Sequence, residues 1–152
     1  MANKLNKRRQ VREKAVQAIF QLLDEKQETS SQDAIAFALE AGNDPDKGFD
    51  QVEDDYLYGL VAGVQEHRAA IDQEIGQHLS QDWTLDRIAK IDLAILRLAF
   101  YELIFEQTQD IPPKVAINEA IDLAKFFSDE KSRVFVSGVL LAYLNQVDPV
   151  QE

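Results

Sequence analysis

The sequence predicts an all-α protein of about seven helices, and three observations support this prediction. Apolar residues recur three and four positions apart along almost the whole chain, the spacing that gathers them on one face of a helix. No segment shows the alternation of apolar and polar residues that a half-buried strand requires. Glycine, proline and short polar runs separate the periodic segments, as is typical of the turns between helices.

Three helical segments are predicted in the first half of the chain. The first covers residues 8–27, where one apolar stripe contains Val11, Ala15, Ala18, Ile19, Leu22 and Leu23. A second helix starts near Ser31 and ends at the loop 42–50, because glycine accepts a left-handed cap and proline cannot continue a helix. A longer helical stretch runs from about Asp50 to Leu79.

The middle of the chain predicts two further helices. Thr84 is a candidate cap for the first of them, and Trp83 can pack on Ile88 as a hydrophobic staple. Residues 91–105 are apolar on nearly every side, which places this helix in the middle of a bundle. The charges on it must then reach a partner or the surface; they are Asp92, Arg97, Glu102 and Glu106.

Two more helices complete the prediction. The Pro112-Pro113 pair opens the first of them, because proline is tolerated in a first turn, and it continues to about Phe127. The last helix covers roughly residues 132–146 and is closed by Asp148-Pro149.

Composition excludes several classes of protein. The chain has 152 residues and no cysteine, so it can bury an apolar core, but a disulfide scaffold, a thiolate zinc site and a cysteine nucleophile are excluded. His67 and His78 match no metal-ligand spacing, and neither a glycine-rich phosphate loop nor a Gly-x-Ser-x-Gly elbow is present. We therefore expect no enzymatic activity, no metal and no cofactor, and we interpret both histidines as surface or half-buried polar residues.

Neither a signal peptide nor a membrane span is predicted. The segment Ala15–Leu23 is interrupted by Gln17 and Gln21, so it lacks the unbroken apolar region of a signal peptide. The longest apolar stretch, Leu93–Tyr101, contains Arg97 and is far shorter than a membrane span. We expect a cytoplasmic protein that has no membrane partner.

The net charge of −11 hides a strong asymmetry. Residues 1–14 contain six basic residues and one acidic residue, which gives +5, whereas the other 138 residues contain ten basic and 26 acidic residues, which gives −16. A basic arm on an acidic body suggests a local anion-binding site. The alternative interpretation is a frayed, solvated terminus.

The residue types in and after this arm suit single-stranded nucleic acid. Arginine forms two hydrogen bonds to a phosphate through its planar guanidinium, and a helix N-terminus would add backbone N–H groups. A phenyl ring can stack on a base and a glutamine amide can read a base edge. The candidate residues are Arg8, Arg9, Arg12, Lys14, Gln17 and Phe20. Core packing beside Ile19 is the alternative interpretation of Phe20.

Four segments, in order, carry a resemblance to a known family. They are residues 8–20 (RRQVREKAVQAIF), 95–103 (ILRLAFYEL), 114–127 (KVAINEAIDLAKFF) and 135–140 (FVSGVL). Together they resemble the NusB family of bacterial transcription antitermination factors, and the resemblance covers nearly the whole chain apart from the loop at 42–50.

The resemblance implies one helical domain over residues 1–152, made of two small packed bundles that share one core. The division falls near Leu79, between an N-terminal sub-bundle of about 1–79 and a C-terminal one of about 80–148. The resemblance also implies binding of boxA, a single-stranded RNA element of ribosomal RNA leaders. The implied protein partners are NusE, a small-subunit ribosomal protein, and the RNA polymerase elongation complex, whose premature termination is suppressed.

Site residues follow from the resemblance by motif position. Arg8, Arg9, Arg12, Gln17 and Phe20 would face RNA from the first helix, joined by Phe135 on the last. Asp92 and Glu102 are the candidates for NusE. Ser137 stands where the family usually has asparagine, and Phe20 stands where it often has tyrosine, so hydrogen-bonding groups are lost at both positions.

Two other functions stay open at the level of sequence. One is a protein-interaction module alone, either a homodimer or a NusE partner, with weak RNA binding. The other is the accessory domain of a ribosomal RNA methyltransferase, although the chain has no βαβ segment and so cannot be the whole of such an enzyme.

Overall fold

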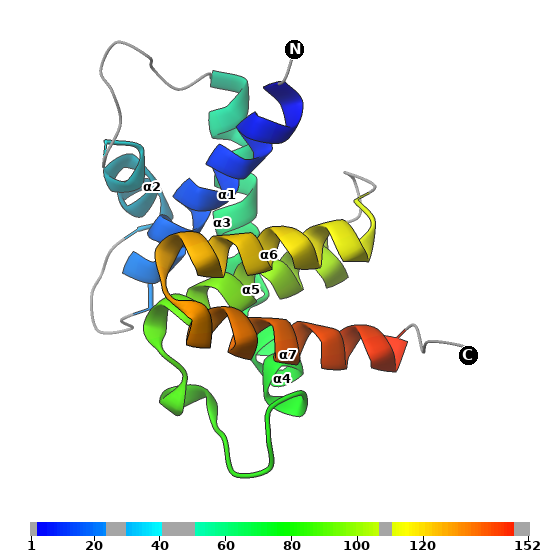
Figure 1. Ribbon diagram of the computed structural model, residues 1–152. Helices are drawn as coiled ribbons and strands as arrows, with labels where there is room; N and C mark the ends of the chain where they lie inside the picture. Colours follow the sequence, from blue (N-terminus) through cyan, green and yellow to red (C-terminus); the bar gives the residue numbers. More distant parts are fainter. Residues whose placement is uncertain (1–2, 24–29, 41–50, 107–110, 148–152) are drawn as a thin grey trace. The chain divides into compact units, whose positions relative to one another are not determined.

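The computed structural model describes residues 3–23, 30–40, 51–106 and 111–147. Within these ranges every regular element is helical, with seven α-helices and one 3₁₀ helix (Figure 1). The all-α prediction is therefore confirmed. None of the described helices is long and apolar enough to cross a membrane. The chain divides into two compact units, Met1–Glu66 and His67–Glu152.

The first unit contains three helices that all pack on one another: α1 (Asn3–Gln21), α2 (Ser31–Glu40) and α3 (Gln51–Glu66). The predicted α1 stripe lies in the core, because Val11, Ala15, Ala18, Ile19 and Leu22 are all buried. They meet Ala34, Ile35 and Ala38 of α2 and Leu57, Leu60, Val61 and Val64 of α3, which are buried as well. The apolar spacing in the sequence thus selected the correct faces.

The bounds of α1 differ from the prediction of residues 8–27. The helix already includes residues 3–7, where lysine and leucine favour helix even without an apolar stripe. It ends at Gln21, where Leu22 and Leu23 donate their N–H groups to Ile19 O and Phe20 O in the tighter i→i+3 pattern. The predicted residues 24–27 and the loop 42–50 lie outside the described ranges.

The predicted stretch from Asp50 to Leu79 is two helices rather than one. Between α3 and α4 (Arg68–Gln77) the helix is interrupted at His67, whose φ and ψ are −101° and 16°. A break of one residue leaves the apolar spacing almost unchanged, so periodicity alone does not detect it. The two compact units divide at this residue, whereas the resemblance implies a division of the sub-bundles near Leu79.

The second unit is built around α5 (Lys90–Ile104), which packs against α4, α6 (Pro113–Phe127) and α7 (Glu130–Val147). Buried apolar residues follow one another on α5 from Ala94 to Phe100, interrupted only by Arg97. This confirms the prediction that a helix without a polar face lies in the middle of a bundle. The start at the proline pair is also confirmed, with Pro112 as the residue before α6.

Two predicted starts in this unit are corrected. The region after Trp83 forms only the short 3₁₀ helix η1 (Leu85–Arg87). Thr84 does not cap it, since its hydroxyl donates a hydrogen bond to the Asp86 carboxylate instead. Helix α7 begins at Glu130, before the predicted Ser132, because Asp129 Oδ1 accepts the Ser132 backbone N–H at 3.0 Å and so caps the first turn.

Candidate nucleic-acid interface

Helix α1 presents a polar face that carries one exposed aromatic ring. At 100° per residue, Arg9, Glu13, Gln17 and Phe20 lie on the same side of the helix. Arg9 is exposed and Phe20 is 42% exposed, whereas Ile19, the next residue in sequence, is completely buried. Core packing is therefore the wrong interpretation of Phe20, and its ring is available to a ligand.

The predicted arginines are not equivalent in the structure. Arg9 is exposed and Arg8 is half-buried, but Arg12 is only 3% exposed. A guanidinium buried to this extent has little surface through which to contact a ligand. The predicted help from a helix N-terminus is also corrected, because α1 begins at Asn3 and these arginines lie beyond its first turn.

Lys14 and Gln17 are half-buried on the same helix. Burial lowers the pKa of Lys14, and the charge of Glu13 raises it in opposition. The Gln17 side-chain Oε1 is buried and accepts no hydrogen bond from the described residues. Its backbone oxygen and that of Ala34 both accept a hydrogen bond from Gln21 Nε2, at 3.5 Å, which joins α1 to α2.

Phe135 belongs to the second unit, on α7, where its ring is half-buried. The ring centroids of Phe135 and Trp83 lie 6.4 Å apart with a 53° tilt. The Arg87 guanidinium carbon lies 4.7 Å from the centroid of the Trp83 ring. Trp83 and Arg87 received no binding role from the sequence. The sequence interprets Trp83-Thr84 only as a helix start, whereas the spacing of four residues between Trp83 and Arg87 is the signal that could have suggested the cluster.

The two residues assigned to NusE are both buried, with Asp92 5% exposed and Glu102 8% exposed. Burial raises the pKa of Asp92, a hydrogen bond from Ser132 lowers it, and the charge of Asp129 raises it again. The Ser132 hydroxyl also lies 2.8 Å from that of Ser128. Asp92 is thus part of a polar cluster inside the junction of α5, α6 and α7.

The other buried charge on α5 is paired within the second unit. Arg97 is 5% exposed, and its Nε and Nη2 donate to the two carboxylate oxygens of Asp72 on α4 at 2.8 and 2.9 Å. This two-bond geometry is the strong form of an arginine–carboxylate pair. Arg97 therefore joins α5 to α4, and the expectation that it reaches a partner or the surface is confirmed by this ion pair.

Both histidines pack against aromatic rings and are half-buried, as predicted. The His67 ring stacks on Phe105 with centroids 4.0 Å apart, and His78 lies edge-on to Tyr143 at 5.6 Å. Among the residues that the structure describes, no group of three histidine, aspartate or glutamate side chains could hold a metal ion.

Fold and surface together define a class: an all-helical protein of two compact units whose first helix carries cations and an open aromatic ring. The model of the NusB family matches residues 9–145, and this chain belongs to that family.

Among named relatives, the transcription antitermination protein NusB of Lactiplantibacillus plantarum is 48% identical over 145 residues, covering 88% of this chain and 91% of the relative. The protein of the same name from Bacillus velezensis is 48% identical over 134 residues, covering 88% and 92%.

Solved structures give the same result. NusB of T. maritima is 32% identical with a TM-score of 0.74, covering 88% of this chain and 87% of that one. A crystal structure of the antitermination factors NusB and NusE in complex with double-stranded RNA contains a chain that is 26% identical, with a TM-score of 0.76 and coverage of 93% and 98%.

Proposed function

We propose that this chain is a transcription antitermination factor that binds single-stranded boxA RNA of ribosomal RNA leaders together with NusE. The pair would act on the RNA polymerase elongation complex in the cytoplasm and suppress premature termination. One observation carries the proposal: the chain is 48% identical, over most of both lengths, to proteins named for transcription antitermination. The crystal structure of NusB and NusE with double-stranded RNA supports NusE and RNA as partners.

The α1 surface supplies the chemistry for RNA. Arg8 and Arg9 can donate paired hydrogen bonds to phosphate oxygens, and the open ring of Phe20 can stack on an unpaired base. Gln17 lies on the same side of the helix as Phe20 and would have to rotate its buried side-chain oxygen outward to read a base edge. Arg12 is buried and Lys14 is half-buried, so these two residues add positive potential beneath the α1 surface rather than direct contacts.

NusE would contact the second unit near α5. Because Asp92 and Glu102 are buried, we assign them a supporting role beneath that surface. Asp92 would act through Ser132 and the start of α7, which its hydrogen bond positions. Neither residue needs a direct contact with the partner for its substitution to weaken the complex.

Salt dependence of RNA affinity tests the proposal. Labelled boxA RNA is titrated with this chain, with and without NusE, over a series of salt concentrations. Each phosphate contact to a single strand contributes a slope of about −0.7 to log K against log[salt]. The Arg8→Ala/Arg9→Ala variant should therefore flatten the slope by roughly one to one and a half.

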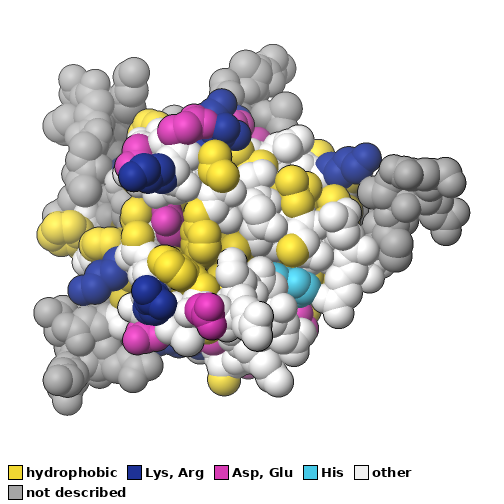
Figure 2. All heavy atoms as spheres, turned by 60° about the horizontal axis from the view of Figure 1, so that its bottom comes forward, with side chains coloured by type: hydrophobic (Ala, Val, Ile, Leu, Met, Phe, Trp, Pro, Cys, Tyr) yellow, Lys and Arg dark blue, Asp and Glu magenta, His cyan; other side chains and the backbone are white. Residues whose placement is uncertain are grey.

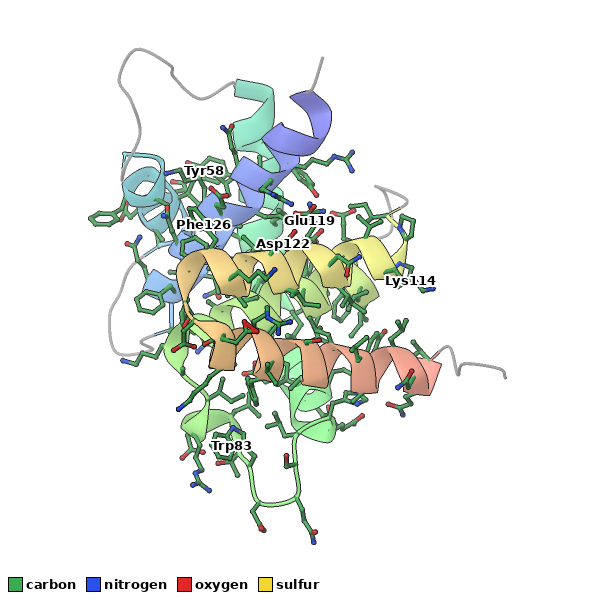
Figure 3. The ribbon with its side chains drawn as sticks, viewed as in Figure 1. Tyr58, Trp83, Lys114, Glu119, Asp122 and Phe126 are labelled. Atoms are coloured by element: carbon green, nitrogen blue, oxygen red, sulfur yellow. The ribbon has the colours of Figure 1, made fainter. Side chains whose placement is uncertain are left out.

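A variant of equal charge provides the control. Lys114 and Lys125 are exposed on α6, and their double substitution by alanine removes the same charge without touching α1 (Lys114 is labelled in Figure 3). Its slope should match that of the wild type. An unchanged slope for the Arg8/Arg9 variant would contradict the α1 interface. Absence of RNA binding both with and without NusE would favour an interaction module alone, and sedimentation would then distinguish a homodimer.

A further inference from the structure

Trp83, Arg87 and Phe135 form a cluster in the second unit, which we call the Trp83 cluster. The Arg87 guanidinium carbon lies 4.7 Å from the centroid of the indole ring. The Phe135 ring lies beside it, with centroids 6.4 Å apart. Two aromatic rings and one cation thus come together from the loop before α5 and from α7 (Figure 3 labels Trp83).

Hydrogen bonds of the loop order the backbone that carries the indole. The Trp83 backbone N–H donates to Ser80 O at 2.9 Å, and the Arg87 N–H donates to Thr84 O at 3.0 Å. The Arg87 side chain is tied down as well, because its Nη1 donates to Asp82 O at 3.2 Å. A side chain held in advance loses little conformational entropy when a ligand binds.

The Trp83 indole is exposed to solvent rather than buried in the core. Trp83 is 38% exposed and Phe135 is half-buried, although tryptophan is on average one of the most buried residues. Figure 2 shows one face of the molecule, on which hydrophobic side chains lie beside both basic and acidic side chains. An exposed Trp83 ring beside the Arg87 guanidinium can stack on a base and attract its phosphate. An apolar peptide would use only the ring.

Among the described residues around the cluster, acids and cations are equal in number, and most of the cations make no ion pair with those acids. Segments 80–90 and 128–135 contain four acids, and three of them have an internal donor: Asp86 from Thr84, Asp129 from the Ser132 N–H, and Glu130 from Arg133. Three of their four cations, Arg87, Lys90 and Lys131, make no ion pair within the described part of the chain. Lys131 lies one turn before Phe135, on the same face of α7.

We propose that the Trp83 cluster is a second RNA contact, in which one unpaired base stacks on the Trp83 indole. Arg87, and Lys131 one turn before Phe135, attract the phosphates on either side of that base. The proposal rests on the proposed function, since it takes the same single-stranded RNA as its ligand. It adds Trp83, Arg87 and Lys131, three residues that neither the family motifs nor the α1 surface supplies.

Tryptophan fluorescence tests the proposal directly, because Trp83 is the one tryptophan of the chain. Unlabelled boxA RNA is added to the wild-type chain alone and to its complex with NusE, and the Trp83→Phe complex supplies the background signal. Stacking of a base should quench the Trp83 emission in proportion to RNA bound. Anisotropy of a labelled RNA measures binding independently in the same samples.

Substitution provides the second measurement. Trp83→Ala should weaken RNA affinity by about five- to 150-fold, whereas Trp83→Phe, which keeps a ring, should lose less. The matched control is Phe126→Ala, which removes a 64% exposed ring from α6 and should leave affinity unchanged. Thermal melting confirms that each variant is folded. Arg87→Gln should flatten the salt slope by about 0.7.

The outcomes separate this proposal from the proposed function. RNA that binds by anisotropy, with no change in Trp83 emission and no loss in Trp83→Ala, overturns the Trp83 contact and leaves the proposed function standing. Quenching by NusE alone, with no further change on adding RNA, makes the cluster a protein contact and also overturns it. If RNA fails to bind even with NusE, both fall together.

Discussion

Phe20 and Ile19 are adjacent in sequence and lie in opposite environments, since the first is 42% exposed and the second completely buried. A similar contrast separates Arg9, which is exposed, from Arg12, which is buried. Residue type alone does not distinguish these pairs. The helical angle does, because positions 9 and 20 share one side of α1 and positions 12 and 19 share another.

The Phe20 ring should therefore matter for binding more than for folding. Phe20→Ala should weaken boxA RNA by about 1–3 kcal/mol, the value of one stacked base, while the melting temperature stays close to that of the wild type. Ile19→Ala, the control, should cost about 2–5 kcal/mol of stability because it opens a cavity in the core. Equal destabilisation by both substitutions would contradict the exposed position of Phe20.

The Arg97–Asp72 pair predicts a penalty from leaving a buried charge alone. Asp72→Ala removes both acceptors of a guanidinium that is 5% exposed. Since the Asp72 side chain is itself 27% exposed, we expect a loss on the order of 2 kcal/mol in urea unfolding, between the values of surface and buried pairs. The exposed Asp82→Ala is the control and should change stability by less than about 0.5 kcal/mol.

Asp92 predicts a particular dependence of stability on pH. Burial, followed by the charge of Asp129, raises the pKa of Asp92 above its ordinary value of 3.8. The folded state then holds a proton that the unfolded state has released, so stability falls as pH rises through that interval. The Asp92→Asn substitution removes this pH-dependent contribution to the unfolding free energy. The difference in unfolding free energy, wild type minus variant, should become more negative from below pH 3.8 upward. A difference that is flat with pH would contradict the shift.

At the scale of the elements, the ends of the helices depend on groups that apolar spacing does not describe. Helix α2 begins where the sequence placed it, and the Ser30 hydroxyl accepts the Asp33 N–H there at 3.0 Å. Helix α7 begins earlier than predicted because Asp129 is its cap. The apolar stripes locate the middles of helices, and single polar hydrogen bonds decide their starts.

The cap of α7 can be tested by itself. Asp129→Ala should cost about 1 kcal/mol of stability, the usual value for a lost N-cap, measured by urea unfolding. Asp129→Asn keeps an acceptor oxygen for the Ser132 N–H and should retain most of it. An asparagine variant as unstable as the alanine variant would show that the charge of Asp129, rather than its hydrogen bond, stabilises the helix.

At the scale of the whole molecule, the charge of −11 is the sum of a basic arm and an acidic body. The net charge alone argues against a nucleic-acid ligand. The distribution of charge allows RNA to be attracted to the few surfaces where basic residues gather, such as the basic arm. The acidic remainder repels RNA elsewhere, which limits non-specific association.

We expect NusE and RNA to strengthen each other's binding to this chain, because coupling between two binding sites is reciprocal. We expect NusE to raise boxA RNA affinity by about 5- to 150-fold, the usual range of coupling between sites, and RNA to raise NusE affinity by the same factor. Two calorimetric titrations, each with the other ligand present or absent, measure both factors. A factor of one in both would mean that the two ligands bind independently.

The sequence by itself determined the helical class, the buried stripes of α1 and α5, the proline start of α6 and the family. These properties depend on local spacing and on contiguous motifs, which a linear chain displays directly. Only the tertiary structure decided that His67 divides α3 from α4, that Arg12, Asp92 and Glu102 are buried, and that Trp83 lies beside Phe135. Burial and side-chain contact depend on which elements pack together, and residues 83 and 135 meet only after the chain has folded back on itself.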